Sequence, residues 1–403
     1  RSIRRSCEGN CKKTAALVPL AGHFQPKPSI IDVMSAGAKR RIYELDLLRG
    51  FFICVIILDH LQLWPSPLQY LTGQGRLWVS AAEGFFLISG LLIGYLRVYK
   101  GMKIPLKDLI KGLLRRAAML YVWGVLITLA VVALSILMPG DGALLPKSPS
   151  VEHTASISAY LFSVISTVFS SDWIYFLRLY AIMLAITPLF IWLVRIGKWW
   201  VALLASLLIY AISLHFQIEE AAMQWQVLFF GAALIGWKLE STLAWLRAHR
   251  KVRTGLIISL IFVTISTMIV SYFMVHGWGY VESPGASISR ESYISVRHSV
   301  DPWFSNNPMV PARIALAFIW FAGLLALFHA IRPFLLKYLG WLLLPFGQAS
   351  LTVYCLQAII LIPIVTFVPL TNHFWLNGLI GALVLLLFAG LIRLPIIQRI
   401  FPR

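Results

Sequence analysis

Charged residues are scarce in this 403-residue chain. Asp, Glu, Lys and Arg make up 13% of it, whereas a soluble domain typically carries about 25%. Only 16 residues are acidic, 59% are hydrophobic, and the mean hydropathy is +0.80. This composition excludes a soluble enzyme, a disordered chain and a nucleic-acid-binding module. It predicts an all-α polytopic membrane protein.

Cysteine is rare as well, with four residues in the whole chain. Cys7 and Cys11 lie in a basic segment without the His residues or the second Cys pair that a zinc site requires. Cys54 and Cys355 lie inside apolar segments. The sequence therefore predicts neither a disulfide framework nor a bound metal.

The chain divides into three parts by composition. The first ~42 residues are basic and lack an apolar core of the length found in signal peptides. We expect residues 1–42 to form a disordered cytoplasmic tail. Long apolar runs then recur, which predicts an integral membrane domain at 43–395 and a short cytoplasmic tail at 396–403.

The apolar runs of the membrane domain give the number of spans. A helix needs about 20 apolar residues to cross the hydrocarbon core. The sequence predicts about ten transmembrane helices, at 47–64, 78–96, 117–138, 173–194, 199–215, 223–238, 255–275, 311–331, 347–368 and 374–393. A further apolar stretch at 156–170 is short and rich in Ser, and we expect it to be re-entrant or interfacial.

The distribution of basic residues selects the topology. With ten spans and the N-terminus inside, 29 of the 35 Lys and Arg residues lie on the cytoplasmic side, as the positive-inside rule requires. If residues 156–170 made an eleventh span, Lys238 to Arg253 and the C-terminal arginines would lie outside. We therefore expect both termini in the cytoplasm. This topology accounts for the net charge of +19 without a nucleic-acid partner.

Three local features stand out between and within the spans. Residues 103–116 (KIPLKDLIKGLLRR) predict an amphipathic helix on the inner leaflet, whose basic face could also meet a phosphorylated cofactor. The outer loops 139–172 and 276–310 are long, and the second is rich in Trp, Tyr, His and Asn. Such side chains suit sugars, although Trp and Tyr are also ordinary interface anchors. Small residues around Gly90 and Gly347 predict close helix packing.

Ionisable residues inside the spans are the main functional candidates, because they are costly to place in a bilayer. Arg49 and His60 lie eleven residues apart on the first span, which is about 16 Å and three helical turns. They therefore share a face, one near each membrane surface. Asp59 points about 100° away from His60, so it need not be the residue that orients the imidazole.

Polar side chains from other spans lie at the depth of His60. They are Glu83, Arg178, Trp225, Gln226 and Arg313. Together with Asp59 and His60 they predict one outward-facing polar pocket. The alternative is that such residues make helix–helix hydrogen bonds, including a structural ion pair between Glu83 and Arg178.

Several sequence runs resemble a known membrane enzyme family. RIYELDLLRGFFICVIILDH (41–60) and SAAEGFFLISG (80–90) are similar to the opening of OpgC-type glucan acyltransferases, a group within the wider membrane acyltransferase family 3. The signature of the wider family is an Arg and a His on the first span at this separation, here Arg49 and His60. The Ser-Ala-Ala-Glu run is the more distinctive OpgC-type mark. Further similarity follows in WIYFLRLYAIMLAITPLF (173–190), MQWQVLFFGA (223–232), NNPMVPARIALAF (306–318) and FGQASLTVYCLQ (346–357).

The resemblance implies a function and a location. An acyl group, typically succinyl or acetyl, would pass from cytoplasmic acyl-CoA to a glycan beyond a bacterial plasma membrane. The same resemblance makes Arg49 and His60 the essential pair, with Asp59 and Glu83 as acidic partners.

Charge and protonation suggest roles on the donor side. A base must accept the proton of the sugar hydroxyl, and an imidazole titrates near neutral pH, so we expect His60 to be the base. Arg49, Arg115 and Arg116 lie toward the cytoplasm and would bind the phosphates of acyl-CoA.

The acceptor side has its own candidates. Arg178 or Arg313 could stabilise the oxyanion or bind a succinyl carboxylate, and Trp225 and Gln226 would contact the substrate. The residues do not distinguish direct transfer through the bundle from a covalent acyl-enzyme.

A transporter or flippase for a glycan, lipid or amphiphile is the competing interpretation, because polar groups inside the membrane occur there too. The sequence shows no repeat that relates its two halves, and its charges lie near the outer surface instead of the midplane. Acyl-CoA distinguishes the two, since a ligand that binds the folded state raises its thermal stability.

Overall fold

The computed structural model describes residues 42–137, 157–166, 171–218, 220–369 and 371–401. These residues are helical, and they contain no strand beyond an isolated bridge between Asn306 and Met309. The expected all-α class is confirmed. The predicted tail at 1–42 and much of the loop at 139–172 lie outside the described residues.

Seventeen α-helices and several short 3₁₀ or π turns make up this part of the chain. The α-helices are α2 (Tyr43–Leu61), α3 (Gln69–Thr72), α4 (Ala81–Leu92), α5 (Leu106–Leu137), α6 (Ile157–Ile165), α7 (Tyr175–Arg195), α8 (Trp199–His215), α9 (Ala221–Ala248), α10 (Arg250–His276), α11 (Trp278–Val281), α12 (Arg290–Val300), α13 (Pro311–Ala330), α14 (Arg332–Tyr338), α15 (Gly340–Gln348), α16 (Ser350–Phe367), α17 (Phe374–Leu391) and α18 (Pro395–Ile400). The other turns are η1 (Gly73–Gly75), the π-helix η2 (Ile93–Tyr99), η3 (Lys100–Lys103), η5 (Asp172–Ile174) and η6 (Asp301–Phe304).

Eight helical stretches in the described residues are long and apolar enough to cross a membrane. They are Ala81–Lys103, Leu106–Leu134, Asp172–Arg195, Ala221–Ala248, Arg250–His276, Pro311–Ala330, Ser350–Phe367 and Phe374–Leu391. Two further predicted spans are helical but differ: α2 has 19 residues with several charges, and α8 has 17. The structure thus confirms a membrane protein with several spanning helices, whereas the count of ten and the side of the termini stay predictions. α6 has nine residues, about 14 Å, too short to cross.

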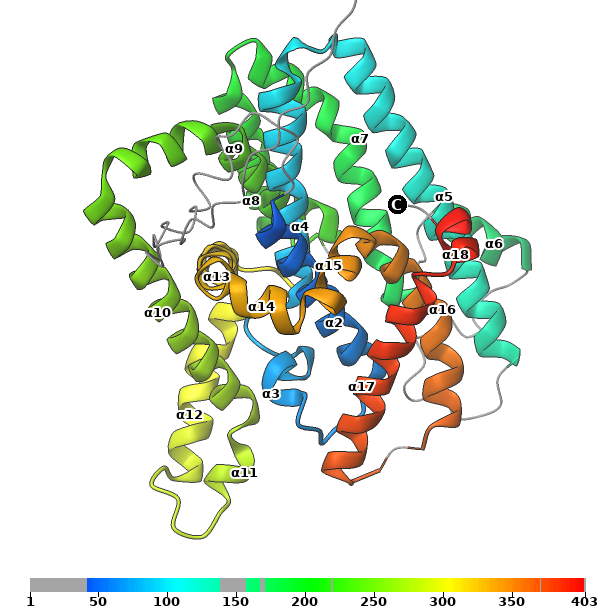
Figure 1. Ribbon diagram of the computed structural model, residues 1–403, viewed down its shortest axis with the longest axis vertical. Helices are drawn as coiled ribbons and strands as arrows, with labels where there is room; N and C mark the ends of the chain where they lie inside the picture. Colours follow the sequence, from blue (N-terminus) through cyan, green and yellow to red (C-terminus); the bar gives the residue numbers. More distant parts are fainter. Residues whose placement is uncertain (1–41, 138–156, 167–170, 219, 370, 402–403) are drawn as a thin grey trace, which may run out of the picture.

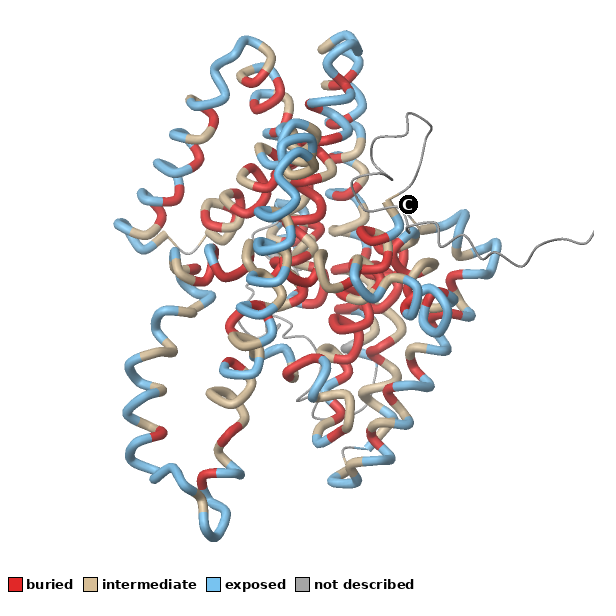
Figure 2. Tube along the Cα trace, turned by 60° about the vertical axis from the view of Figure 1, so that its left-hand side comes forward, coloured by how far each residue is buried: buried red, intermediate tan, exposed pale blue. Residues whose placement is uncertain are grey.

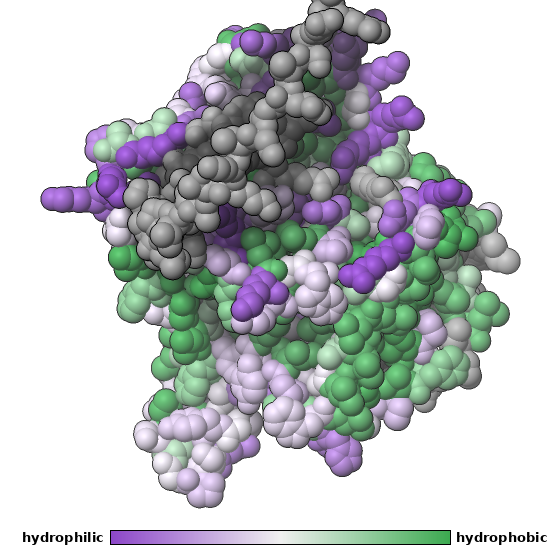
Figure 3. Space-filling view, viewed as in Figure 1, coloured by the Kyte–Doolittle hydropathy of each residue, from purple (hydrophilic) through white to green (hydrophobic). Residues whose placement is uncertain are grey.

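Polar and apolar surfaces separate along the long axis of the molecule. The start of α5 and the junction of α9 with α10 lie at the upper end in Figure 1, and α11 and α12 lie at the lower end. Hydrophilic side chains gather toward the upper end in Figure 3, and a hydrophobic zone lies below them. We call the upper end, which includes residues 97–116 and 238–253, the basic end.

The segment at 103–116 differs from its prediction. It is not a separate helix on the inner leaflet, because residues from Leu106 onward form the first turns of α5, which continues to Leu137. The 32 residues of α5 span about 48 Å, more than the ~30 Å of the hydrocarbon core. The basic residues therefore project from a membrane helix at the basic end. The segment 276–310, predicted to be an outer loop, contains the short helices α11, α12 and η6.

α2 lies at the centre of the bundle. It contacts α4, α13, α15, α16 and α17, and Leu47, Leu48, Ile53 and Ile57 on it are fully buried. Figure 2 shows the buried segments gathered in the middle of the molecule, with exposed faces on the outer helices. A polar residue on α2 therefore meets protein on every side, and its neighbours are set by the face it occupies.

Glycines allow close backbone contact in two helix pairs, α2 with α15 and α4 with α9. The small residues around Gly90 and Gly347 predicted this close packing. A Cβ on Gly347 of α15 would lie 1.8 Å from the carbonyl oxygen of Asp46 on α2, and one on Gly50 would lie 2.0 Å from that of Leu343. A Cβ on Gly90 of α4 would lie 2.1 Å from the carbonyl oxygen of Phe229 on α9. These contacts fix how α2 and α4, the two helices with the main candidate residues, sit among their neighbours.

Candidate functional site

A cavity of about 570 Å³, including its opening, lies between α2, α4, α5, α7 and α16. Its lining consists of Arg49, Ile56, Ala82, Phe85, Phe86, Ser89, Arg116, Phe176, Leu177, Tyr180, Ser350, Leu351 and Tyr354. Two guanidinium groups, two Tyr and two Ser are the polar members, and these lining residues include no acidic side chain. We call this space the arginine cavity, and its charge suits an anionic ligand with an apolar portion.

The two arginines reach the cavity from different helices. Arg49 of α2 lies with its Cζ 5.8 Å from the ring centre of Phe85, and Arg116 comes from α5. The Nε atoms of both are buried and have no hydrogen-bond partner among the described residues. Arg115, one residue earlier on α5, is exposed and does not line the cavity. Of the three arginines predicted for acyl-CoA, the structure brings together Arg49 and Arg116.

His60 is held by residues from two other helical segments. Its Nδ1 lies 2.8 Å from Oε1 of Gln357 on α16. The Gln357 amide in turn donates from Nε2 to the carbonyl oxygen of Trp173, at 3.2 Å. The imidazole stacks on the Trp173 ring with centres 5.5 Å apart and planes 11° from parallel. Because Oε1 can only accept, Nδ1 carries the proton, and in the neutral imidazole Nε2 then holds the lone pair that a base needs.

The imidazole is not part of the lining of the arginine cavity, but residues one helical turn away are. Each member of the His60–Gln357–Trp173 group sits one helical turn from a residue that lines it: His60 follows Ile56, Gln357 follows Tyr354, and Trp173 precedes Phe176. Arg49, Ile56 and His60 form one stripe along α2, so the expectation that Arg49 and His60 share a face is confirmed. The lining of the cavity therefore includes two cationic groups, and the imidazole of His60 lies one helical turn from the lining residue Ile56.

Glu83 and Arg313 meet each other instead of a cavity. Glu83 is fully buried at the start of α4, where its Oε2 accepts from the backbone amide and the hydroxyl of Ser80 in a capping box. Its Oε1 accepts from the guanidinium of Arg313 on α13, which also donates to the Phe304 carbonyl oxygen at 3.0 Å. This pair joins α4 to α13 and replaces the alternative pairing of Glu83 with Arg178.

The other candidates from the outer layer have separate partners. Arg178 Nη2 lies 2.7 Å from Oε2 of Glu220, and its side chain is 20% exposed. Gln226 is buried and hydrogen-bonded to the hydroxyl and carbonyl oxygens of Ser206 on α8. Trp225 packs edge-on against Phe86 and Phe176 at the wall of the arginine cavity.

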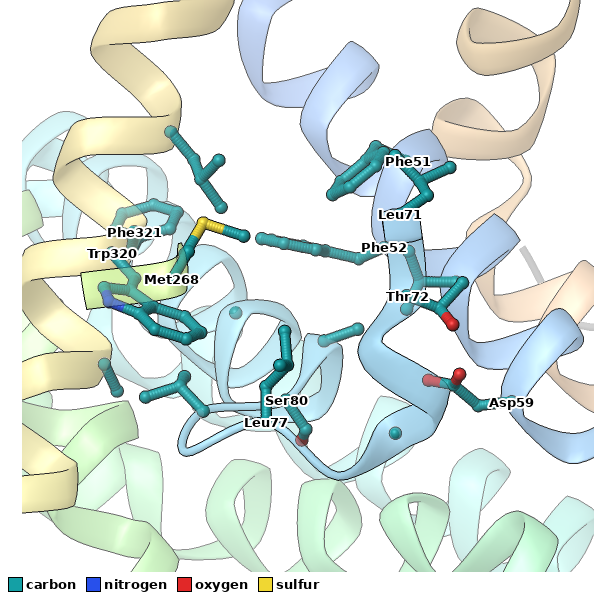
Figure 4. A pocket seen from close by; sticks show the side chains of 17 residues that line it. Phe51, Phe52, Asp59, Leu71, Thr72, Leu77, Ser80, Met268, Trp320 and Phe321 are labelled. Carbon is teal, nitrogen blue, oxygen red and sulfur yellow. The ribbon is translucent and has the colours of Figure 1, made fainter. Parts of the chain in front are cut away.

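Asp59 faces a second cavity, of about 550 Å³ including its opening, on a different face of α2. Figure 4 shows its carboxylate beside Thr72, with Met268 and Trp320 across the space. The expectation of one polar pocket is therefore wrong, because successive residues of a helix point about 100° apart and meet different neighbours. Asp59 lies apart from the imidazole of His60, as their spacing on α2 allowed.

The described residues hold no group of three or more His, Cys, Asp or Glu arranged for a metal ion. The polar groups of the arginine cavity and of the His60–Gln357 contact are guanidinium, imidazole, hydroxyl and amide groups.

A family model described as OpgC protein matches residues 41–395. The chain belongs to the OpgC family. Neither the curated proteins nor the solved structures that were searched contain a match. Membership of the OpgC family and the apolar helices together indicate a membrane protein that modifies glucans.

Two residues that contact His60 were not among the candidates predicted from the sequence, namely Gln357 and Trp173. Gln357 and Trp173 are uncharged, so the cost of placing ionisable groups in a bilayer identifies neither of them. A signal was present, however, because Trp173 begins one of the runs that resemble OpgC-type enzymes and Gln357 ends another. A polar amide at the centre of an apolar span is itself costly unless it is hydrogen-bonded, which marks Gln357 as a position with a partner.

Proposed function

We propose that the protein is an integral-membrane O-acyltransferase. It moves an acyl group, succinyl or acetyl, from cytoplasmic acyl-CoA to a hydroxyl of an extracytoplasmic glycan, in the plasma membrane of a bacterium and with the architecture of acyltransferase family 3. The observations that carry the proposal are the arginine cavity, whose lining includes Arg49 and Arg116, and the imidazole of His60, one helical turn beyond the lining residue Ile56. The donor itself has phosphates at one end and a thioester at the other.

The donor binds along the cavity in this proposal. Guanidinium groups form charge-assisted hydrogen bonds with phosphate oxygens, and the free Nε–H groups of Arg49 and Arg116 are available for them. The aromatic wall that includes Phe86 and Phe176 packs along the apolar parts of the pantetheine arm. The thioester then lies near His60, and direct transfer is the simpler of the two routes.

The chemical step uses the lone pair on Nε2 of His60. Nε2 takes the proton of the sugar hydroxyl while the oxygen of that hydroxyl attacks the thioester carbonyl carbon. A C–O bond forms, the C–S bond breaks, and the proton passes from the imidazole to the departing thiolate. Gln357 accepts from Nδ1–H throughout and holds the ring in this tautomer, the task that a carboxylate performs in other His-based sites.

We choose between Arg178 and Arg313 as the residue of the acceptor side by comparing how exposed their side chains are. Arg313 is 8% exposed and bound to Glu83, so its guanidinium is occupied by a structural partner. Arg178 pairs with Glu220 through Nη2, but it is 20% exposed and its Nε has no hydrogen-bond partner among the described residues. We therefore assign recognition of a succinyl carboxylate, or of the oxyanion, to Arg178.

Mass spectrometry of extracytoplasmic glycans tests the proposal. Cells expressing the wild type should show glycans heavier by one acyl group, and cells expressing His60→Ala should not. His249→Ala, which changes an exposed His at the end of α9, is the matched control and should modify glycans like the wild type. Unmodified glycans in every strain, with all proteins expressed and both substrates present, would contradict the proposal and favour a transporter.

A binding measurement separates the two functions further. Acyl-CoA should raise the melting temperature of the purified protein, because it binds the folded state. A transporter for glycans or amphiphiles has no reason to respond to it.

A further inference from the structure

The Asp59 cavity is separate from the proposed reaction path. Phe52, Val55 and Asp59 face it from α2, whereas Arg49, Ile56 and His60 form the stripe toward the arginine cavity. Its remaining walls come from α3, α4, α10 and α13 and the connection before α4. Its charge is also opposite to that of the arginine cavity, because its lining includes one carboxylate and no Lys or Arg. A ligand of this space therefore differs from acyl-CoA.

The cavity is polar on one side only. Asp59 and Thr72 lie together, while Met268, Trp320 and Phe321 lie across from them (Figure 4). The indole Nε1 of Trp320 donates to the hydroxyl of Thr267 at 2.8 Å, so it is already satisfied. The far side is thus a hydrocarbon and aromatic surface, which suits an alkyl chain.

Asp59 has an oxygen that the protein does not satisfy. Its Oδ1 is buried without a hydrogen-bond partner among the described residues. Leaving a carboxylate oxygen buried and unpaired is costly. The carboxylate has a side-chain hydrogen bond with Thr72, and a Cβ on Gly75 would lie 3.3 Å from Oδ2, but Oδ1 stays without a partner among the described residues. The missing partner is a hydrogen-bond donor or a cation.

We propose that the Asp59 cavity binds a membrane lipid with an ammonium headgroup. The alkyl chain lies against Trp320 and Phe321, and the ammonium donates to the Asp59 carboxylate. Leu71, which lines the cavity, is 49% exposed, so the space opens at the surface next to α3. A sugar ring fits less well, because each ring needs several polar partners and the lining supplies few besides Asp59 and Thr72.

Native mass spectrometry of the delipidated protein with added lipid tests this proposal. The probes are phosphatidylethanolamine, which carries an ammonium, and phosphatidylglycerol with the same acyl chains, which does not. The wild type should bind one phosphatidylethanolamine at least tenfold more tightly than phosphatidylglycerol. Asp59→Asn keeps the shape of the side chain and should remove this preference.

A second variant tests the cavity itself. Ala317, on α13, is 1% exposed and lines the space, so Ala317→Phe should fill it and lower lipid binding at least tenfold. Ala205→Phe places the same ring on an exposed position of α8 and should leave binding unchanged. Equal binding of both lipids by the wild type, equal binding by the two Phe variants, or displacement of the lipid by a soluble glucan would each overturn the proposal. None of these readouts depends on acyl transfer.

Discussion

Nδ1 of His60 donates its hydrogen bond to a neutral amide, Oε1 of Gln357, across 2.8 Å and 297 residues of sequence. A carboxylate, Asp59, is the next residue along the chain, but it faces another cavity. The protein thus fixes the tautomer of the imidazole without placing a charge next to it in the membrane, where a charge is costly.

Gln357 should act as a positioning residue for His60. Replacement by Leu removes the acceptor for Nδ1–H, and we expect kcat to fall by about 10- to 100-fold with KM for acyl-CoA unchanged, since only the proton transfer is impaired. Gln357→Glu keeps an acceptor oxygen and should lose less activity than Gln357→Leu. The measurement is steady-state acyl transfer. A rise in KM with kcat intact would place Gln357 on substrate binding instead.

Arg116 and Arg115 form a matched pair for testing the donor site. Arg116 lines the arginine cavity and Arg115 is exposed outside it. A hydrogen bond to a charged group contributes about 1.5–3 kcal/mol, so Arg116→Ala should weaken acyl-CoA binding by roughly 10- to 100-fold. Arg115→Ala should bind acyl-CoA like the wild type in the same titration. Equal losses in both variants would indicate a general effect of charge at the basic end.

The sequence was sufficient for the membrane class and for most helix positions, because these depend on apolar runs that need no knowledge of neighbours. It also showed that Glu83 and Arg313 lie at one depth. It could not show that they pair, because the partner of a polar side chain depends on how each helix is rotated and on which helix it packs against. Glu83, Arg178 and Gln226, which were predicted to share a layer, therefore have separate partners.

The structure differs from the prediction at three points, and each difference has a physical cause. The charges of segment 103–116 predict a helix that is separate from the following span. No Pro interrupts the chain between Leu106 and Leu137, however, so one uninterrupted helix forms. The single predicted pocket does not form, because α2 is surrounded by other helices and its successive residues meet different ones: Asp59 faces one cavity, and His60 contacts Gln357. Gln357 was missed because it carries no charge.

The Glu83–Arg313 pair should be structural. Removing one partner leaves the other charge buried and unpaired, which typically costs about 3–5 kcal/mol. We expect Glu83→Leu and Arg313→Met each to lower the melting temperature of the purified protein strongly. The double variant should regain much of the loss, because neither charge is then left alone. A double variant as unstable as the sum of the single ones would show that the pair is not coupled.

Gly347 offers a test of how closely α15 must pack on α2. A Cβ at this position would lie 1.8 Å from the carbonyl oxygen of Asp46, so Gly347→Ala forces the two helices apart. Overpacking of this kind costs about 1–3 kcal/mol, and the melting temperature should fall. Gly255→Ala on α10 is the control, because nothing lies within 4 Å of its Cβ and Ala favours a helix by about 1 kcal/mol over Gly. If displacement of α2 also moves Arg49 and His60 relative to the arginine cavity, Gly347→Ala will lose acyl transfer at temperatures where it is still folded, while Gly255→Ala keeps it.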